Sequence, residues 1–240
     1  MISIKENYEL MKNEFIKIKK MGLIELENDT VGSKFEKIIG IKDNQLMYPD
    51  FFGIEIKTHN EFDKHQITLF NLTPENKINE LFEKYSYEPK NNSKRLYGDF
   101  TTINKGNIGI KYHGILKISN KKLHMLIYDI YNNLIDDSTY WLLDKIVERF
   151  EQKCNNLCFI KCQKFKINNK YYVKYQDMTL YSIKNKNTII DLIKEGIITI
   201  NIKVDLYKTG PKKGMPHDHG TSFRLNSNNL DKLFDIIYIK

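Results

Sequence analysis

The sequence predicts a mixed α/β or α+β fold in which helices flank a mixed β-sheet. Three observations support this class. Segments with apolar residues at helical spacing alternate along the chain with extended segments rich in Ile, Tyr and Phe. No internal repeat or low-complexity linker interrupts them. The length of 240 residues suits one domain, or two modest lobes, that can bury a sizeable core.

The first half of the chain is expected to open with a helix over residues 4–20. Ser3 and Glu6 have the spacing of a capping box, and apolar residues follow at helical intervals at Tyr8, Met11, Phe15 and Ile18. The elements expected next are a helix over 33–39, strands over 52–58 and 65–70, a helix that begins at Pro74, and extended segments over 97–102, 108–118 and 121–131.

The second half is expected to begin with a helix over residues 138–152 that turns Trp141 inward. The loop over 209–220 is assigned from its three glycines and two prolines, which break regular structure. The remaining expected elements are strands over 157–167 and 171–175, a helix over 188–194, a strand over 197–207, a short strand near Phe223, a helical turn over 230–234 and an extended end over 236–239.

The charge balance favours a polyanionic partner. There are 38 basic and 30 acidic residues, which gives a formal net charge of +8. Only three of the basic residues are arginine, and alanine is absent altogether. Because this composition indicates AT-rich coding bias, the abundance of lysine by itself is weak evidence for nucleic-acid binding.

The cellular setting expected from the sequence is a reducing cytoplasm. No apolar run approaches the roughly 20 residues needed to cross a bilayer, and the N-terminal segment lacks the continuous apolar stretch of a signal peptide. The odd count of cysteines, at Cys154, Cys158 and Cys162, argues against a disulfide framework. Their even spacing admits a metal cluster, but 157–167 looks extended, so we expect three buried, reduced thiols.

The most informative segment covers residues 48–58. Side chains alternate across a strand, so Glu55 and Lys57 share one face, opposite Ile56. Asp50 lies just upstream, where the chain enters the strand. Two carboxylates and one ammonium group are therefore expected to meet at one sheet edge.

This grouping of charges suits metal-assisted hydrolysis of a phosphodiester. Mg²⁺ accepts one or two carboxylates, keeps several waters and takes phosphate oxygens as further ligands. Asp50 and Glu55 would hold the ion together with the Ile56 carbonyl, and Lys57 would orient or deprotonate the attacking water. The alternative is a plain ion pair, because Glu-x-Lys is common in alternating strands. Glu36, on the preceding helix, adds an acid but equally fits a solvated helix position.

The second informative segment covers residues 210–224, a shaped loop that leads into a strand. Its Arg224 offers a planar fork that can bind guanine O6 and N7 together. Histidines can donate to base edges, an aspartate can accept from cytosine N4, and lysines can neutralise phosphates. The loop residues of these types are Lys212, Lys213, His217, Asp218 and His219.

Two other interpretations of this loop stay open. His-x-His can supply two zinc ligands, although no cysteine or carboxylate pair stands nearby at a familiar spacing. The loop can also be purely structural, with histidines that cap backbone groups.

The chain resembles the MvaI/BcnI type II restriction endonucleases, which use a PD-(D/E)xK nuclease core related to that of the mismatch-repair nickase MutH. Order and spacing hold across nearly the whole chain, and the histidine motif is far more specific than Glu-x-Lys. The motifs that carry the resemblance are Gly32-x-x-Phe35-Glu36, Pro49-Asp50-Phe51 followed by Ile54-Glu55-Ile56-Lys57-Thr58-His59, and His217-Asp218-His219-Gly220-Thr221-x-Phe223-Arg224.

The resemblance implies Mg²⁺-dependent cleavage of double-stranded DNA that leaves 5′-phosphate and 3′-hydroxyl ends. It places Asp50, Glu55 and Lys57 in the active site, with Glu36 as an accessory acid. It also places the segment 217–224, including Thr221, at the DNA major groove as base-reading residues.

The resemblance further implies a monomer with a catalytic lobe and a DNA-recognition lobe, which we set at residues 1–155 and 156–240. Family members cut short, near-palindromic C/G-rich sites by nicking one strand and rebinding in the opposite orientation. The physical partner is then double-stranded DNA. A companion methyltransferase is expected as a genetic neighbour only.

One departure concerns the recognition sequence. MvaI-like sequences carry an arginine on the strand before the glycine loop, where this chain has Lys203, which can donate to guanine but lacks the bidentate fork. Three other functions stay open: a MutH-like nickase that cuts one strand and stops, a DNA-binding module without catalysis, and a zinc hydrolase built on His217 and His219.

Overall fold

The computed structural model describes residues 3–41, 48–75, 78–89 and 93–239, and it forms two compact units. Unit 1 comprises residues 1–67, 151–185 and 228–240, and unit 2 comprises residues 68–150 and 186–227. Each unit is therefore assembled from separate stretches of chain. This division differs from the single boundary after residue 155 that was expected from the sequence.

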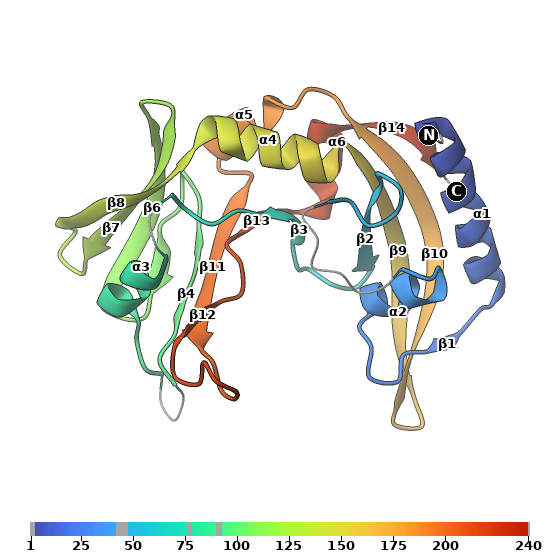
Figure 1. Cartoon of the computed structure of the whole chain (residues 1–240), viewed down its shortest axis with the longest axis horizontal. Helices are drawn as coiled ribbons and strands as arrows, with labels where there is room; N and C mark the ends of the chain where they lie inside the picture. Colours follow the sequence, from blue (N-terminus) through green and yellow to red (C-terminus); the bar gives the residue numbers. More distant parts are fainter. Residues whose placement is uncertain (1–2, 42–47, 76–77, 90–92, 240) are drawn as a thin grey trace. The chain divides into compact units, whose positions relative to one another are not determined.

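Unit 1 is built on one mixed sheet in the order β1-β10-β9-β2, with β14 also paired to β10 (Figure 1). β2 runs parallel to β9, whereas the other pairings are antiparallel. The mixed α+β class expected from the sequence is thus confirmed. The strands are β1 (Ile24–Glu25), β2 (Glu55–Asn60), β9 (Asn156–Ile167), β10 (Lys170–Ile183) and β14 (Phe234–Ile239).

Helices α1 (Ile4–Lys20) and α2 (Val31–Ile38) pack on this sheet. The expected capping box is present, because Glu6 N donates to Ser3 Oγ at 3.3 Å and Ser3 N donates to Glu6 Oε2 at 2.6 Å. The apolar stripe of α1 is buried with side chains from α2, β2, β9 and β10 in one core, which includes Phe15, Phe35, Ile56, Ile160 and Tyr175. The three cysteines are buried thiols outside any disulfide, as expected.

Unit 2 contains two sheets, in the orders β12-β11-β13-β3 (with β4 paired to β11) and β5-β6-β7-β8. Their strands are β3 (Ile67–Asn71), β4 (Leu96–Phe100), β5 (Gly106–Ile108), β6 (Tyr112–Ser119), β7 (Lys122–Asp129), β8 (Leu134–Leu142), β11 (Thr199–Leu206), β12 (Pro216–Asp218) and β13 (Ser222–Leu225). The remaining helical segments of the chain are α3 (Ile78–Tyr85), α4 (Leu143–Cys154), α5 (Thr188–Lys194), η1 (Ser227–Asn229) and α6 (Leu230–Leu233).

Four sequence predictions of element boundaries were wrong. The helix expected over 138–152 is a strand up to Leu142 and a helix only from Leu143. Trp141 therefore belongs to β8, where it is fully buried against Phe223 and its Nε1 donates to the Leu72 carbonyl at 2.9 Å. The strand expected over 171–175 continues to residue 183 in β10, and the strand expected from residue 52 begins at residue 55. The helix expected from Pro74 is described from residue 78.

A tight turn over residues 51–54 explains the late start of β2. Phe51 and Ile54 exchange two backbone hydrogen bonds of 2.9 Å, and both residues between them have positive φ, 45° at Phe52 and 86° at Gly53. Such a pair of positive φ values is typical of a type I′ turn, which favours Asn-Gly rather than an aromatic residue. Because position 52 holds phenylalanine, the residue types of this segment do not predict the turn.

The turn yields a stability prediction at Gly53. Replacement by alanine is expected to lower the free energy of unfolding by about 1–2 kcal/mol, because an L-residue in the left-handed region is strained. A Cβ there would meet no heavy atom within 4 Å, so the cost is in the backbone alone. Gly53→Asn should cost less, since asparagine tolerates this conformation. Equilibrium denaturant unfolding of the two variants measures the difference, and equal stabilities would contradict the strain.

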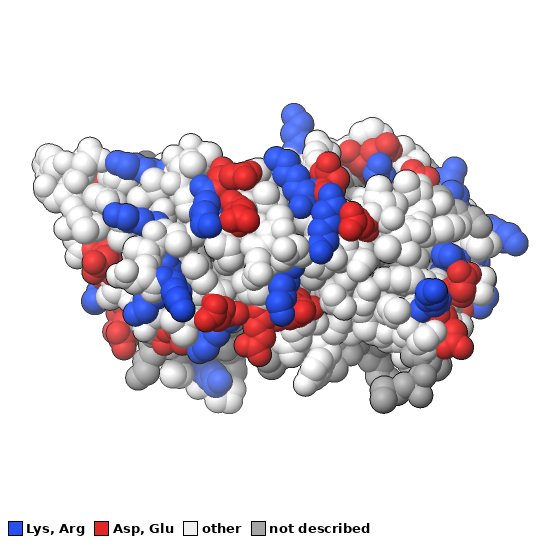
Figure 2. Space-filling view, turned by 90° about the horizontal axis from the view of Figure 1, so that it is seen from above, with Lys and Arg blue, Asp and Glu red and all other residues white. Residues whose placement is uncertain are grey.

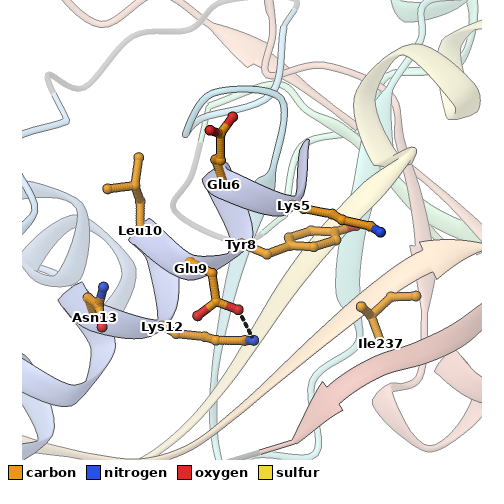
Figure 3. Close-up of a pocket in the computed structure, with 8 residues that line it drawn as sticks. All are labelled: Lys5, Glu6, Tyr8, Glu9, Leu10, Lys12, Asn13 and Ile237. Atoms are coloured by element: carbon orange, nitrogen blue, oxygen red, sulfur yellow. Dashed lines mark hydrogen bonds and ion pairs between the residues drawn. The ribbon is translucent and has the colours of Figure 1, made fainter. Parts of the chain in front are cut away.

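The described surface carries mixed charge and one apolar groove in unit 1. Figure 2 shows acidic and basic side chains interspersed on the face in view, rather than a continuous basic area. The groove, of about 620 Å³, lies between α1 and β14, with Tyr8, Leu10 and Ile237 among its lining residues (Figure 3). None of the predicted site residues lines it.

In the described part of the chain, no helix has both the length and the apolar character needed to span a bilayer.

Candidate active site and recognition loop

Helix α1 and strand β9 hold the turn that precedes β2. Asn7 Nδ2 donates to the Phe52 carbonyl at 2.8 Å, and Asn156 Nδ2 donates to the Gly53 carbonyl at 3.2 Å. Asn156 is fixed in turn by the Tyr8 hydroxyl, which donates to its Oδ1 at 2.6 Å. The strained turn therefore has two side-chain anchors from distant parts of the sequence, and these fix where the next side chains emerge.

The predicted meeting of Asp50, Glu55 and Lys57 is present in the structure. Asp50 Oδ2 accepts a hydrogen bond from the Ile56 backbone N–H at 2.9 Å, which ties the carboxylate to the start of β2. Strand alternation puts Glu55 and Lys57 on one face, and Lys57 Nζ donates to Glu55 Oε1 at 2.5 Å. The Glu55 side chain is only 2% exposed and that of Lys57 is 22% exposed.

A fourth charged group, Lys153 from the last turn of α4, joins the site. Its Nζ lies 2.7 Å from Glu55 Oε2 and 3.5 Å from Asp50 Oδ1. It also donates to the Tyr48 carbonyl at 2.8 Å. Lys153 therefore bridges the two carboxylates with a positive charge. No local motif pointed to it, because it lies about a hundred residues from either acid in the sequence.

The electrostatics of the site follow from burial and from this pairing. Burial raises the pKa of the Glu55 carboxyl, and the nearby charge of Asp50 adds to the effect, while Lys57 and Lys153 oppose it. Burial alone would lower the pKa of Lys57, but the charge of Glu55 and its hydrogen bond raise it above the usual value. Lys57 is therefore protonated at neutral pH as long as Glu55 is its main partner.

The cluster is chemically matched to a divalent cation. With all four groups ionised, two carboxylates and two ammonium groups balance each other in a largely buried setting. Glu55 Oε2 is buried and, among the residues that the structure describes, lacks a partner with hydrogen-bond geometry, although Lys153 Nζ is close. The Lys153 ammonium lies between oxygens of the two carboxylates. Carboxylate oxygens are hard ligands, so the donor set fits Mg²⁺.

Two further residues, Ile56 and Glu36, were predicted for this site. The Ile56 side chain is buried in the core, and the residue lies on β2 directly between Glu55 and Lys57. Glu36 lies half-buried on α2, within range of Tyr175, whose pKa is raised chiefly by burial and also by the charge of Glu36. The catalytic role of Glu36 and the metal-binding role of the Ile56 carbonyl stay predictions.

In unit 2, the histidine loop folds onto β11. The antiparallel register sets Asp205 opposite His217, and His219 follows directly after β12 ends at Asp218. His219 Nε2 lies 3.0 Å from Asp205 Oδ1, and Tyr97 Oη donates to Asp205 Oδ2 at 2.8 Å. Burial would raise the pKa of Asp205, but the hydrogen bonds from Tyr97 and His219 bring it below the usual value.

Ring stacking holds the imidazole of His217, the other histidine of the loop. The ring of Tyr207 stacks on His217 at 4.1 Å between centroids, and His217 lies 4.2 Å from the His219 ring. Asp218 Oδ1 accepts from the Gly220 N–H at 2.8 Å, while burial raises the pKa of the Asp218 carboxyl. The loop is thus a shaped structure with two partly exposed imidazoles.

The other residues predicted to contact DNA differ in how far their side chains are exposed to solvent. Lys203, Lys212 and Lys213 are exposed, and the first two lie over the rings of Tyr97 and Tyr207. Among described residues, the buried Arg224 Nε has no hydrogen-bond partner, which leaves a donor for a ligand. Thr221 departs from the expectation, because its side chain is 0% exposed and cannot reach a duplex without rearrangement. Its carbonyl instead accepts from the Leu72 N–H at 2.9 Å.

Comparison with known protein families decides the assignment. The model of the MvaI/BcnI restriction endonuclease family matches residues 7–234. The chain belongs to this family. The match contains all three motifs on which the resemblance was drawn, and membership of the MvaI/BcnI family makes the chain a type II site-specific deoxyribonuclease, as expected.

Solved structures of MvaI agree with the family assignment. A complex of restriction endonuclease MvaI with cognate DNA substrate has a TM-score of 0.88 and 26% identity, and the match covers 100% of this chain and 99% of that chain. MvaI in the absence of DNA has a TM-score of 0.62 and 28% identity with the same coverage. No curated protein matches the chain.

Proposed function

We propose that this member of the MvaI/BcnI family hydrolyses phosphodiester bonds in both strands of DNA at a short C/G-rich, near-palindromic site. Mg²⁺ is the proposed metal, and the products carry 5′-phosphate and 3′-hydroxyl ends. The observation that carries the proposal is the meeting of Asp50, Glu55 and Lys57 at the start of β2. The cognate DNA in the similar MvaI complex supports duplex DNA as the partner.

Asp50 and Glu55 are the residues that would hold the metal, with the Ile56 carbonyl beside them. Lys153 already places a positive charge against both carboxylates, which supports this pair as the place where a cation would bind. When bound, Mg²⁺ supplies Lewis-acid stabilisation of the phosphate oxygens and lowers the pKa of a coordinated water. We infer that the Lys153 ammonium leaves this position when the metal enters, since both cannot occupy it.

Lys57 would act on the attacking water. Glu55 holds its ammonium on the same face of β2, next to the place where a phosphate would lie against the carboxylates. A positioned ammonium group stabilises charge that develops on the phosphate oxygens in the transition state. With the charge of Glu55 neutralised by a bound cation, Lys57 would hold its proton less tightly, and its amine could orient the water or accept a proton from it. Glu36 would act as an accessory acid.

The loop of unit 2 would read the sequence. Arg224 would offer its guanidinium, whose Nε has no hydrogen-bond partner among the described residues, to guanine, and the imidazoles of His217 and His219 would offer ring nitrogens to base edges. Asp218 would accept from a cytosine amine. Lys203, Lys212 and Lys213 would contact phosphates or guanine, because their ammonium groups are exposed.

Replacing Arg224 by alanine is expected to reduce discrimination between the cognate site and its single-base variants by about 1–3 kcal/mol. The physical reason is the loss of a bidentate contact with one guanine. Binding to a panel of variant oligonucleotides at fixed salt measures it. Uniform weakening over the whole panel would show instead that Arg224 contacts a phosphate. Lys213→Ala, which removes an exposed ammonium group of the same loop, is the matched phosphate-contact control.

Digestion of supercoiled plasmid DNA tests the proposed function. Protein and Mg²⁺ are expected to give discrete linear fragments, and sequencing of their ends gives the recognition site and cut position. A reaction with a chelator in place of Mg²⁺ is the control. Accumulation of open circles alone would favour the nickase, and tight binding without cleavage in either Mg²⁺ or Mn²⁺ would favour a DNA-binding module. The expectations of a monomer, a cytoplasmic location and a neighbouring methyltransferase gene stay predictions.

A further inference from the structure

A second group of potential metal ligands lies in unit 2, formed by Asp205, His217 and His219. Strand pairing explains why they converge. Asp205 on β11 is the cross-strand partner of His217 on β12, and His219 follows directly after β12 ends at Asp218, with its ring 4.2 Å from that of His217. The backbone N–H of His219 donates to the Lys203 carbonyl at 3.0 Å, which keeps His219 next to β11.

The three ligand atoms lie close together. His219 Nε2 is 3.0 Å and His217 Nδ1 is 4.0 Å from Asp205 Oδ1, and all three atoms lie within 4.8 Å of one another. Zinc binds imidazole nitrogen and carboxylate oxygen at about 2.0–2.2 Å, so neighbouring ligand atoms in a tetrahedral site are about 3.3 Å apart. The distance from His219 Nε2 to Asp205 Oδ1 is already close to this spacing, and His217 Nδ1 would have to approach Asp205 Oδ1 by about 0.7 Å.

The surroundings of this cluster are those of a metal site. Ligating carboxylates are usually hydrogen-bonded through their second oxygen, and Tyr97 Oη donates to Asp205 Oδ2 at 2.8 Å. The stacked ring of Tyr207 restricts the rotation of His217. Two imidazoles and one carboxylate favour a first-row transition metal, whereas the carboxylates and carbonyl at β2 favour a hard ion such as Mg²⁺.

We propose that Asp205, His217 and His219 form a binding site for a transition-metal ion of the Zn²⁺ class, separate from the Asp50–Glu55 site. The three residues leave the fourth zinc position open to water. One consequence rests on the proposed function: a bound Zn²⁺ occupies the imidazole nitrogens that would read base edges, so Zn²⁺ and specific DNA compete. Recognition of the DNA sequence would then be sensitive to transition metals, while the Asp50–Glu55 site would be unaffected.

A zinc titration of the full chain, without DNA and without Mg²⁺, tests the site. A chromophoric chelator competes with the protein for Zn²⁺ and reports free metal. The wild type is expected to bind one Zn²⁺ that is lost, or weakened at least about tenfold, in both His219→Ala and Asp205→Asn. Tyr97→Phe, which removes only the hydrogen bond to Asp205, should weaken binding about tenfold. His124→Ala, on β7 beside Tyr140, is the matched control and should bind as the wild type does.

The same titration distinguishes Zn²⁺ at this site from Zn²⁺ bound by other residues of the chain. Glu55→Gln disables the carboxylates of unit 1 and should leave this Zn²⁺ in place. Co²⁺ in place of Zn²⁺ should give the spectrum of nitrogen and oxygen ligands, with no thiolate charge-transfer band, because the three cysteines are buried. Circular dichroism melting confirms that each variant is folded, and two substitutions in different strands keep the test open if one fails.

The proposal is overturned if the wild type shows no saturable Zn²⁺ binding, or if both His219→Ala and Asp205→Asn bind Zn²⁺ like the wild type. Adding cleavable plasmid DNA then separates the site from the function. Competition predicts that DNA raises the Zn²⁺ concentration needed for half-saturation by the same factor by which Zn²⁺ weakens DNA binding. Zinc binding that DNA leaves unchanged would keep the metal site and reject the base-reading role of the histidines.

Discussion

Lys57→Ala is expected to lower the rate of DNA cleavage by about 10²–10⁴-fold while specific DNA binding in the absence of cleavage stays nearly unchanged. Lys57 lies on the same face of β2 as Glu55, with which it makes its one described ion pair. Its loss removes the group that would position or deprotonate the water. Single-turnover cleavage, measured beside DNA affinity in Ca²⁺, separates the chemical step from binding.

The control for this variant is Lys161→Ala. Lys161 is an exposed lysine on the neighbouring strand β9, and its change removes a positive charge of the same kind from the same sheet. Cleavage by Lys161→Ala should remain within about twofold of the wild type, as expected for a surface substitution. A Lys57→Ala protein that loses binding and cleavage in equal measure would contradict the assigned role, because the lysine would then contribute to affinity rather than to chemistry.

Lys153→Met is expected to destabilise the metal-free protein by about 3–5 kcal/mol and, at the same time, to tighten its binding of divalent cations. Removing Lys153 leaves two neighbouring carboxylates with one ammonium group, and Glu55 is almost fully buried. Added Mg²⁺ should restore much of the lost stability, because the ion replaces the missing positive charge. Thermal and denaturant unfolding with and without Mg²⁺, together with Mn²⁺ titration followed by electron paramagnetic resonance, measure both effects.

Lys145→Met serves as the control for Lys153→Met. Lys145 lies on the same helix, α4, but its ion pair with Glu75 is largely exposed on the lysine side. Exposed pairs contribute about 0–1 kcal/mol, so this variant should be nearly as stable as the wild type and should respond little to Mg²⁺. If Lys153→Met instead binds Mn²⁺ more weakly than the wild type, Lys153 supports the metal rather than standing in its place.

The two variants separate what sequence could predict about the site from what it could not. Asp50, Glu55 and Lys57 were predicted together because strand alternation is a local rule, and a local rule brings them to one edge of β2. Lys153 was missed because its approach depends on how α4 is placed against β2, which no periodicity encodes. The same limit applies to Asp205, whose neighbours come from the pairing of β11 with β12.

Errors in the elements also have physical causes. Phe52 adopts positive φ only because the turn is anchored by Asn7 and Asn156, so tertiary contacts override a local preference. Trp141 and the apolar residues after it fit either a strand end or a helix, and burial against Phe223 decides for the strand. Thr221 was placed at the DNA with its motif, although its side chain fills the interior beneath the loop.

The most direct test of the catalytic site is a crystal structure of the protein with its DNA and Mn²⁺ in place of Mg²⁺, analysed by anomalous scattering. We expect an anomalous peak bonded to carboxylate oxygens of both Asp50 and Glu55, next to a phosphate, with the Lys153 ammonium displaced. DNA bound with no peak there, and with Lys153 still bridging the two carboxylates, would contradict the proposed metal site.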